Sequence, residues 1–216
     1  MTFFYLLLLA HLVGDFPLQS DAIFRLKQKS MQGVLLHVAI FSAVAILILL
    51  PFLSYPPVWL AILMLSVFHV ALDRFKLTIA NSSASDRFRY FLLDQALHLL
   101  SLWLVGIWLE NKLTGVSVPV LYQDRRLLIM INALVIAGFA GSILLFYTEK
   151  MFLHRFLNGQ TPTFPKQRQR WPGIVVRMIA TGGALLGGWY SSALLLLPVF
   201  ILLHPSWHNN DKPLYG

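Results

Sequence analysis

Seven ionisable side chains stand inside apolar segments of this chain, all at the same end of the helices that those segments predict. They are three aspartates and four histidines: His11, Asp15, His37, His69, Asp73, Asp94 and His98. An ionisable group within a bilayer is costly and normally faces the interior of a helical bundle. Because the whole chain has only nine acidic residues, this placement predicts helices packed around a shared polar site.

The composition indicates a membrane protein. Hydrophobic residues make up 57% of the chain and charged residues 12%, whereas a soluble domain carries about a quarter charged residues. We predict an all-α polytopic membrane helical bundle with about seven transmembrane helices of about 20 residues each. The predicted spans cover residues 2–17, 33–52, 58–79, 88–109, 126–148, 172–189 and 191–204.

The basic residues predict the orientation of these spans. With the N-terminus outside, only Lys112, Arg125 and Arg126 of the 17 lysines and arginines lie on the outer side. Cytoplasmic loops of membrane proteins carry the excess of basic residues, so the prediction is N-out and C-in. The net charge of +8 follows from this arrangement. No nucleic-acid partner is expected, because no basic recognition helix or motif occurs.

Two segments outside the spans are predicted to lie at the cytoplasmic face. Residues 20–32 are polar and basic around a few apolar residues, which predicts an interfacial helix. Residues 158–171 hold three glutamines, two prolines and a basic cluster, which predicts a loop that contacts anionic lipid headgroups. We divide the chain into a four-helix core that bears the histidines and aspartates, 1–110, and three further membrane helices, 111–216.

Three predicted helices carry a histidine and an aspartate four residues apart. Residues at this spacing share one face of a helix and lie about 6 Å apart along its axis. The histidine comes first in the first and third spans, whereas Asp94 precedes His98 in the fourth span, which runs in the opposite direction. The aspartates are therefore expected in the layer nearest the cytoplasm, and the histidines one turn deeper.

Imidazole and carboxylate groups together are the ligands of zinc, manganese and non-haem iron sites. The chain has no cysteine, so nitrogen and oxygen atoms would supply every ligand. We predict one or two divalent metal ions (zinc, manganese or iron) held by the same seven residues: His11, Asp15, His37, His69, Asp73, Asp94 and His98. Asp15, Asp73 and Asp94 are also the candidate catalytic residues, as a general base for a metal-bound water.

Four neighbouring polar residues are candidates for binding substrate. Gln19 and Gln95 can orient ligands or substrate through hydrogen bonds, and Arg74 and Lys76 can bind an anionic group such as a phosphate. The alternative for Arg74 and Lys76 is that they extend to the membrane interface, and the alternative for Asp94 is an ion pair with a nearby arginine. Four further polar residues have no role assigned by the sequence: Glu149, His154, His204 and His208.

The pattern resembles a known family. It consists of His11-Leu-Val-Gly-Asp15-Phe-Pro-Leu-Gln19, His37, His69-x-x-x-Asp73-x-x-Lys76 and Asp94-Gln95-x-x-His98. It resembles a family of small bacterial integral membrane proteins of unknown function, over about the first 100 residues. The resemblance implies a multi-pass protein of the bacterial inner (cytoplasmic) membrane. More loosely, the chain is similar to the membrane-bound metal-dependent hydrolases described as LexA-regulated.

A metal site near the cytoplasmic headgroups favours a membrane-embedded metal-dependent hydrolase, acting on a lipid phosphate or a similar anionic substrate. One alternative is a divalent-metal or proton-coupled transporter. Transporter sites usually lie near the bilayer midplane, however, whereas these residues cluster at one end of their helices. Two further alternatives are haem bound by histidine pairs and a structural or partner-binding membrane protein. The sequence determines neither the substrate nor the oligomeric state.

Overall fold

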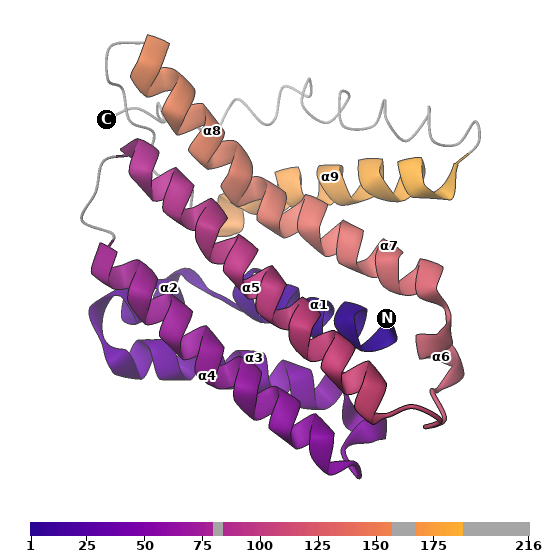
Figure 1. The fold of residues 1–216 in the computed structure, drawn as a ribbon. Helices are drawn as coiled ribbons and strands as arrows, with labels where there is room; N and C mark the ends of the chain where they lie inside the picture. The colour runs from indigo at the N-terminus through magenta and orange to yellow at the C-terminus, as the bar shows by residue number, and fades with distance from the viewer. Residues whose placement is uncertain (80–83, 157–166, 188–216) are drawn as a thin grey trace. The chain divides into compact units, whose positions relative to one another are not determined.

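The computed structural model describes residues 1–79, 84–156 and 167–187, and every regular element in these ranges is helical (Figure 1). This confirms the all-α prediction. The helices are α1 (Thr2–Asp15), α2 (Asp21–Lys29), α3 (Met31–Ile48), α4 (Pro56–Ile79), α5 (Ala84–Lys112), α6 (Val120–Gln123), α7 (Arg125–Val135), α8 (Gly141–Phe156) and α9 (Gln167–Leu186). A 3₁₀ turn (Leu50–Phe52) follows α3, and a π-helical turn (Ile136–Ala140) joins α7 to α8.

Four helices form a bundle in which each packs against two others. Helix α1 contacts α3 and α5, and α4 also contacts α3 and α5, so the four close into a ring. Large apolar side chains fill the half of the ring nearest the start of α1, and Phe3 meets Phe52 there with ring centroids 4.9 Å apart. This dry packing holds the helices in a fixed register, which positions the polar residues at the other end.

The outer surface of the bundle is as apolar as its core. Leu47, Leu63 and Val67 are 60 to 69% exposed, while histidines and aspartates are buried inside. Large apolar surfaces are uncommon on soluble monomers and are expected where a helix faces lipid. Four segments are long and apolar enough to cross a membrane, as a membrane protein requires: Met31–Ile48, Pro56–Leu77, Phe88–Lys112 and Arg125–Glu149.

These four segments coincide with four of the seven predicted spans. The first predicted span corresponds to α1, which is apolar but has only 14 residues. The sixth overlaps α9, a helix of 20 residues that is not among the four membrane-length segments. The last predicted span, 191–204, lies outside the described residues, as do most of the loop predicted at 158–171 and the side chain of His154.

The predicted segment 20–32 contains the helix α2, which packs against α3. Two serines begin the two helices: the Ser20 hydroxyl accepts a hydrogen bond from the Ile23 amide (3.3 Å), and the Ser30 hydroxyl accepts one from the Gly33 amide (3.1 Å). The contact between α2 and α3 is very close, because a Cβ atom on Gly33 would lie 2.2 Å from the carbonyl carbon of Leu26. A glycine at this position therefore lets α2 lie against the start of α3.

The chain divides into two compact units, Met1–Asn132 and Ala133–Gly216. The first extends beyond residue 110, where the sequence analysis placed the boundary. Two hydrogen bonds attach the additional segment to the bundle: the Tyr122 hydroxyl donates to the Ile48 carbonyl (2.8 Å), and the Asn132 amide donates to the Tyr5 carbonyl (3.2 Å). Such tertiary contacts of single polar residues leave no periodic signal in a sequence.

In the second unit, an arginine of α9 satisfies the carbonyl groups of the π-helical turn. Arg177 donates from Nε to the Ala137 carbonyl (2.9 Å), and from a terminal nitrogen to the Gly138 carbonyl (2.8 Å) and to the Ser142 hydroxyl. A π turn interrupts the regular helical hydrogen-bond pattern, so the guanidinium stabilises an otherwise weak point.

Replacing this arginine should destabilise the second unit. We expect Arg177→Met to cost about 1–3 kcal/mol, because carbonyl groups lose a charged donor. The midpoint of thermal unfolding in detergent measures the effect. Arg177→Lys, which keeps the charge but not the planar fork, should lose less. Equal midpoints for the wild type and Arg177→Met would contradict this role.

Candidate metal centre

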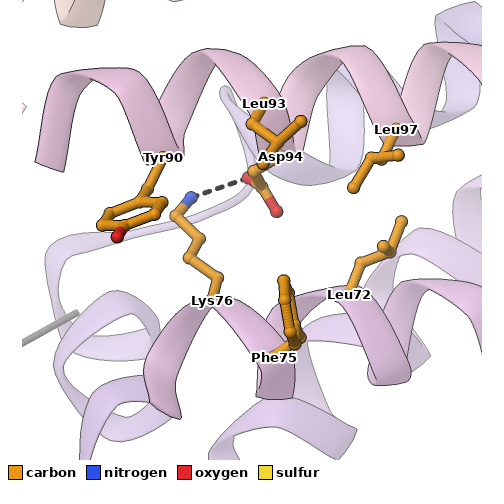
Figure 2. Close-up of a pocket in the computed structure, with 7 residues that line it drawn as sticks. All are labelled: Leu72, Phe75, Lys76, Tyr90, Leu93, Asp94 and Leu97. Atoms are coloured by element: carbon orange, nitrogen blue, oxygen red, sulfur yellow. Dashed lines mark hydrogen bonds and ion pairs between the residues drawn. The ribbon is translucent and has the colours of Figure 1, made fainter. Parts of the chain in front are cut away.

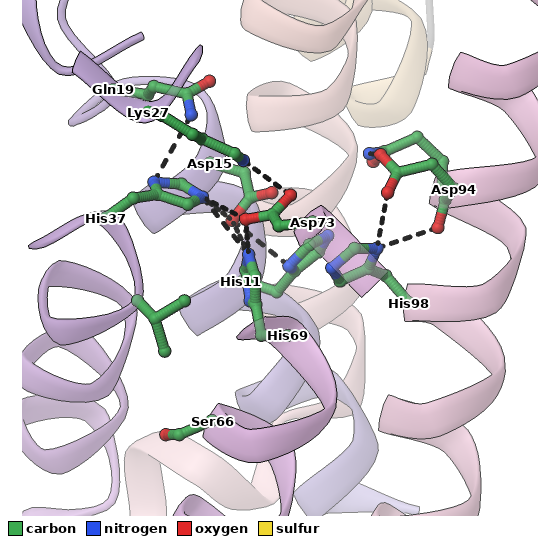
Figure 3. Close-up of polar contacts among 12 residues, drawn as sticks. His11, Asp15, Gln19, Lys27, His37, Ser66, His69, Asp73, Asp94 and His98 are labelled. Atoms are coloured by element: carbon green, nitrogen blue, oxygen red, sulfur yellow. Dashed lines mark hydrogen bonds and ion pairs between the residues drawn. The ribbon is translucent and has the colours of Figure 1, made fainter. Parts of the chain in front are cut away.

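The four bundle helices bring all seven predicted ligands to one end of the bundle (Figure 3). Helix α1 contributes His11 and Asp15 from its last two turns, and α3 contributes His37 from its second turn. Helix α4 contributes His69 and Asp73, and α5 contributes Asp94 and His98. Every one of these side chains is buried, with residue exposures from 0% to 8%.

Four of these residues, which we call the central cluster, are Asp15, His37, His69 and Asp73. Nε2 of His69 lies 3.2 Å from Nε2 of His37. Asp15 Oδ1 lies 3.5 Å from the His37 nitrogen and 3.4 Å from the His69 nitrogen. Asp73 Oδ2 lies 3.7 Å and 3.5 Å from the same two nitrogens.

These separations match those of ligands around one ion. Four ligands at about 2.1 Å from a tetrahedral zinc ion lie about 3.4 Å from one another. The five measured separations in the central cluster run from 3.2 to 3.7 Å. Each of these five pairs has the spacing of neighbouring ligands around one ion.

The remaining three ligands flank the central cluster. Nδ1 of His11 lies 3.4 Å from Oδ1 of Asp15, and the ring of His11 stacks on that of His98 with centroids 5.0 Å apart. His69 and His98 meet edge to face, with centroids 4.5 Å apart. Asp73, Asp94 and His98 form a further group whose ligand atoms lie within 4.8 Å of one another.

Several of these polar atoms lack the hydrogen bonds that burial demands. Within the described part of the chain, five ligand atoms are buried without a hydrogen-bond partner: His11 Nε2, Asp15 Oδ1, Asp73 Oδ2, Asp94 Oδ1 and His98 Nε2. More than about 90% of buried polar groups in proteins have such a partner, and an unsatisfied one is costly. Divalent cations would satisfy such imidazole nitrogens and carboxylate oxygens.

Hydrogen bonds orient two of the histidines. Nδ1 of His98 lies 2.8 Å from the backbone carbonyl oxygen of Asp94. The carbonyl can only accept, so Nδ1 carries the proton and Nε2 presents a lone pair, as in metal-bound histidines. The Gln19 amide lies 3.3 Å from Nδ1 of His37. A metal on Nε2 of His37 requires Gln19 to accept from Nδ1–H through its amide oxygen.

Two lysines place positive charge beside the aspartates. Nζ of Lys27 lies 2.6 Å from Oδ1 of Asp73, and Nζ of Lys76 lies 2.7 Å from Oδ2 of Asp94. The two oxygens of Asp73 thus have separate contacts, one with an ammonium and the other with the histidines. With neutral imidazoles, three carboxylates and two ammonium groups leave one net negative charge, which favours a cation.

Sequence reasoning missed Lys27. It was grouped with the basic residues of the interfacial helix, yet its residue exposure is only 8%. The polar residues around it are exposed, and nothing in its spacing distinguishes it from Lys29. Only the close packing of α2 on α3 brings Lys27 to Asp73 on α4.

The four predicted substrate-binding residues have different environments. Gln19 contacts His37, and the Gln95 amide donates to Oδ2 of Asp94 (3.2 Å) beside Lys76. Lys76 of α4 forms an ion pair with Asp94, in place of the nearby arginine that the sequence suggested as an alternative. The Arg74 side chain is exposed and does not join the buried histidines and aspartates. Glu149 is exposed in α8, and His204 and His208 lie outside the described residues.

The polar site is confined to one end of the bundle. Next to it, the hydroxyl groups of Ser42 and Ser66 lie 2.8 Å apart, so one donates to the other, and the one that accepts donates to a carbonyl of its own helix. Beyond these serines, the buried bundle side chains described by the structure are apolar, including Leu6, Leu49 and Leu109. The described residues therefore form no polar path through the far half of the bundle.

Residues 3–129 match a protein family described as "Protein of unknown function (DUF3307)". The matched stretch contains the four bundle helices, α2, and every residue of the candidate metal centre. No curated protein and no solved structure matches the chain.

Proposed function

The chain belongs to the DUF3307 family of proteins of unknown function, and we propose that it is a membrane-embedded metal-dependent hydrolase. The observation that carries the proposal is the set of five buried ligand atoms that have no hydrogen-bond partner among the described residues. They belong to imidazole and carboxylate groups, which are the ligands of zinc, manganese and iron in proteins. One or two ions bound among these groups would supply the partners that these atoms lack.

The central cluster would hold the first ion, through Asp15, His37, His69 and Asp73. A second ion would use the neighbouring group of Asp73, Asp94 and His98, with His11 close by. A divalent ion bound at such a site lowers the pKa of water towards about 7 and stabilises charge that develops on a phosphoryl or carbonyl oxygen. Seven candidate ligands serve one or two ions, with any remaining groups orienting the others.

Asp94 is the residue best placed to accept a proton. Its Oδ2 is held by Lys76 and by the Gln95 amide, while its Oδ1 is buried without a hydrogen-bond partner. A general base needs a fixed carboxylate with one oxygen directed at the reacting water. In hydrolysis of a phosphate ester, the water attacks phosphorus and Asp94 takes its proton; the P–O bond to the alcohol breaks, and the proton held by Asp94 passes to the leaving oxygen.

The proposed substrate is a lipid phosphate or a similar anionic lipid. Four helices of membrane-spanning length support a site reached from the bilayer, and the ligands gather at one end of those helices, where headgroups lie. In the predicted N-out orientation this is the cytoplasmic end, in the inner membrane of a bacterium.

A divalent-metal or proton-coupled transporter is the second candidate, since buried histidines and aspartates also line ion pathways. The apolar far half of the bundle favours the hydrolase, because transport needs access from both sides. Uptake of zinc or manganese into liposomes that contain the protein would favour transport. A structural polar core is the third candidate, favoured by the Lys27–Asp73 and Lys76–Asp94 pairs, which neutralise much of the charge.

The test of the hydrolase is phosphate release from a panel of lipid phosphates by purified protein loaded with zinc, manganese or iron. We expect Asp94→Asn to keep the ion of the central cluster, to which Asp94 does not belong, and to lose about 10²–10⁴-fold in rate, which is the usual contribution of a general base. Glu110→Gln is the matched control, since Glu110 lies on the same helix and contacts the first backbone amides of α1 instead. Metal-loaded protein that hydrolyses no member of the panel would reject the proposal.

A further inference from the structure

A groove lies between α4 and α5 beside the metal centre (Figure 2). Its lining residues are Leu72, Phe75, Lys76, Tyr90, Leu93, Asp94 and Leu97. Its volume is about 20 Å³, room for a water-sized group, so it is a shallow groove. Both helices are of membrane-spanning length, and Phe75 and Leu93 are 55% and 48% exposed. The groove therefore opens on the apolar outer surface of the bundle.

The polar side chains of the groove connect it to the metal centre. Nζ of Lys76 reaches from α4 to Oδ2 of Asp94 on α5 (2.7 Å), as Figure 2 shows, and lies 5.4 Å from the centre of the Phe91 ring. The other oxygen of Asp94 faces inward, 3.5 Å from Nδ1 of His98. Asp94 thus belongs both to the groove and to the candidate metal centre.

This combination specifies the chemistry of an occupant. Leucine and aromatic side chains suit a hydrocarbon chain, and the ammonium of Lys76 suits an anionic group attached to that chain. An arriving anion can replace Asp94 as the partner of Lys76, so that the ammonium is paired both before and after the exchange. An uncharged lipid offers no such exchange, and separating a buried ion pair without a new partner is strongly unfavourable.

We propose that the α4–α5 groove is the lateral entry site for a lipid with an anionic headgroup, whose acyl chain lies along Leu72, Leu93 and Leu97 and whose headgroup pairs with Lys76. The role of this lipid as a substrate rests on the proposed hydrolase, whereas its binding in the groove does not. The exchange leaves Oδ2 of Asp94 with the Gln95 amide as its remaining partner. Loss of the ammonium from Oδ2 would make the Asp94 carboxylate, whose Oδ1 faces the metal centre, a stronger base.

The test measures lipid binding without metal or turnover. Metal-free protein in phosphatidylcholine nanodiscs receives phosphatidic acid that carries a photoactivatable diazirine in one acyl chain, and the labelled residues are located by mass spectrometry. We expect labelling at Leu72, Phe75 and Leu93. Unlabelled phosphatidic acid should compete, whereas inorganic phosphate and phosphatidylcholine should not.

Two variants and one control complete this test. Leu97→Trp should fill the groove and remove most of the labelling, and Lys76→Gln should abolish the preference for phosphatidic acid over phosphatidylcholine. Leu104→Trp, the same substitution at an exposed position further along α5, should label as the wild type does. The midpoint of thermal unfolding of Leu97→Trp in detergent should equal that of the wild type, which shows that the variant is folded.

The outcomes separate this proposal from the hydrolase. Labelling in the groove by a protein that hydrolyses nothing would support the binding site and reject the hydrolase. Labelling spread evenly over the outer faces of α3, α4 and α5, or unchanged in Leu97→Trp, would overturn the groove proposal even if the protein hydrolyses lipid phosphates. Competition by inorganic phosphate would also overturn it, because it would identify a site for the free anion.

Discussion

Purified wild-type protein without a polyhistidine tag is expected to hold one or two divalent metal ions per chain, and His69→Ala is expected to lose them. Nε2 of His69 lies within 3.5 Å of the ligand atoms of His37, Asp15 and Asp73, so this substitution removes a ligand that contacts the other three of the central cluster. Loss of a group that merely supports a ligand weakens metal binding about 10–100-fold. Loss of His69, a ligand itself, should weaken metal binding by more than this. Elemental analysis and competition with a chelator measure the change.

The matched control is Ser66→Ala. Ser66 lies on α4 three residues before His69, and its hydroxyl donates to the Ile62 carbonyl without contacting the cluster. This variant should keep the wild-type metal content. Asp73→Ala should also lose metal, and its remaining helical content shows whether it is folded. Wild-type protein that binds none of zinc, manganese and iron after reconstitution would reject the metal centre and leave a structural polar core.

Gly33→Ala should have the second large effect, through the displacement of α2. The new Cβ atom would lie 2.2 Å from the carbonyl carbon and oxygen of Leu26, and backbone atoms cannot move aside as a flexible side chain can. Displacement of α2 withdraws Lys27 from Asp73, and leaving a buried charge unpaired costs about 3–5 kcal/mol. Unfolding by denaturant in detergent measures the loss, and hydrogen exchange should show the amides of α2 less protected.

Two comparisons locate the cause. Gly182→Ala places the same methyl group in α9, 3.7 Å from the nearest atom of Leu134, and should be neutral or stabilising by up to about 1 kcal/mol, since alanine favours helix over glycine. Lys27→Met removes the ammonium without the clash, so it should destabilise the protein while α2 stays protected. Wild-type stability of Gly33→Ala would show that the close approach of α2 and α3 has no energetic importance.

The convergence of the histidines and aspartates could be anticipated because helix geometry is regular. A spacing of four residues puts His69 and Asp73 on one face of any α-helix, and the reversed order of Asp94 and His98 follows from the reversed direction of α5. The burial of these groups follows from the apolar residues around them. The number of membrane spans and their orientation stay predictions that rest on hydropathy and charge alone.

Other features of the site could not be anticipated, because they depend on rotations and contacts between helices. Lys76 and Arg74 are two residues apart, yet Lys76 reaches Asp94 and Arg74 is exposed. From the sequence, Lys76 and Arg74 were equally good candidates for binding an anion. Similarly, Tyr122 and Asn132 each contact the bundle through a hydrogen bond. The first compact unit therefore includes residues beyond 110.

By itself, the sequence determined that this is an all-helical chain suited to a membrane, with imidazole and carboxylate groups at one end of its helices. Local periodicity and composition carry that information, and neither depends on how the helices pack. Only the tertiary structure decided that Lys27 contacts Asp73, that Asp94 connects the metal centre to the α4–α5 groove, and which ligand atoms lack partners. These features arise from distances of a few ångströms between residues far apart in the chain, set by close contacts such as that of Gly33 with Leu26.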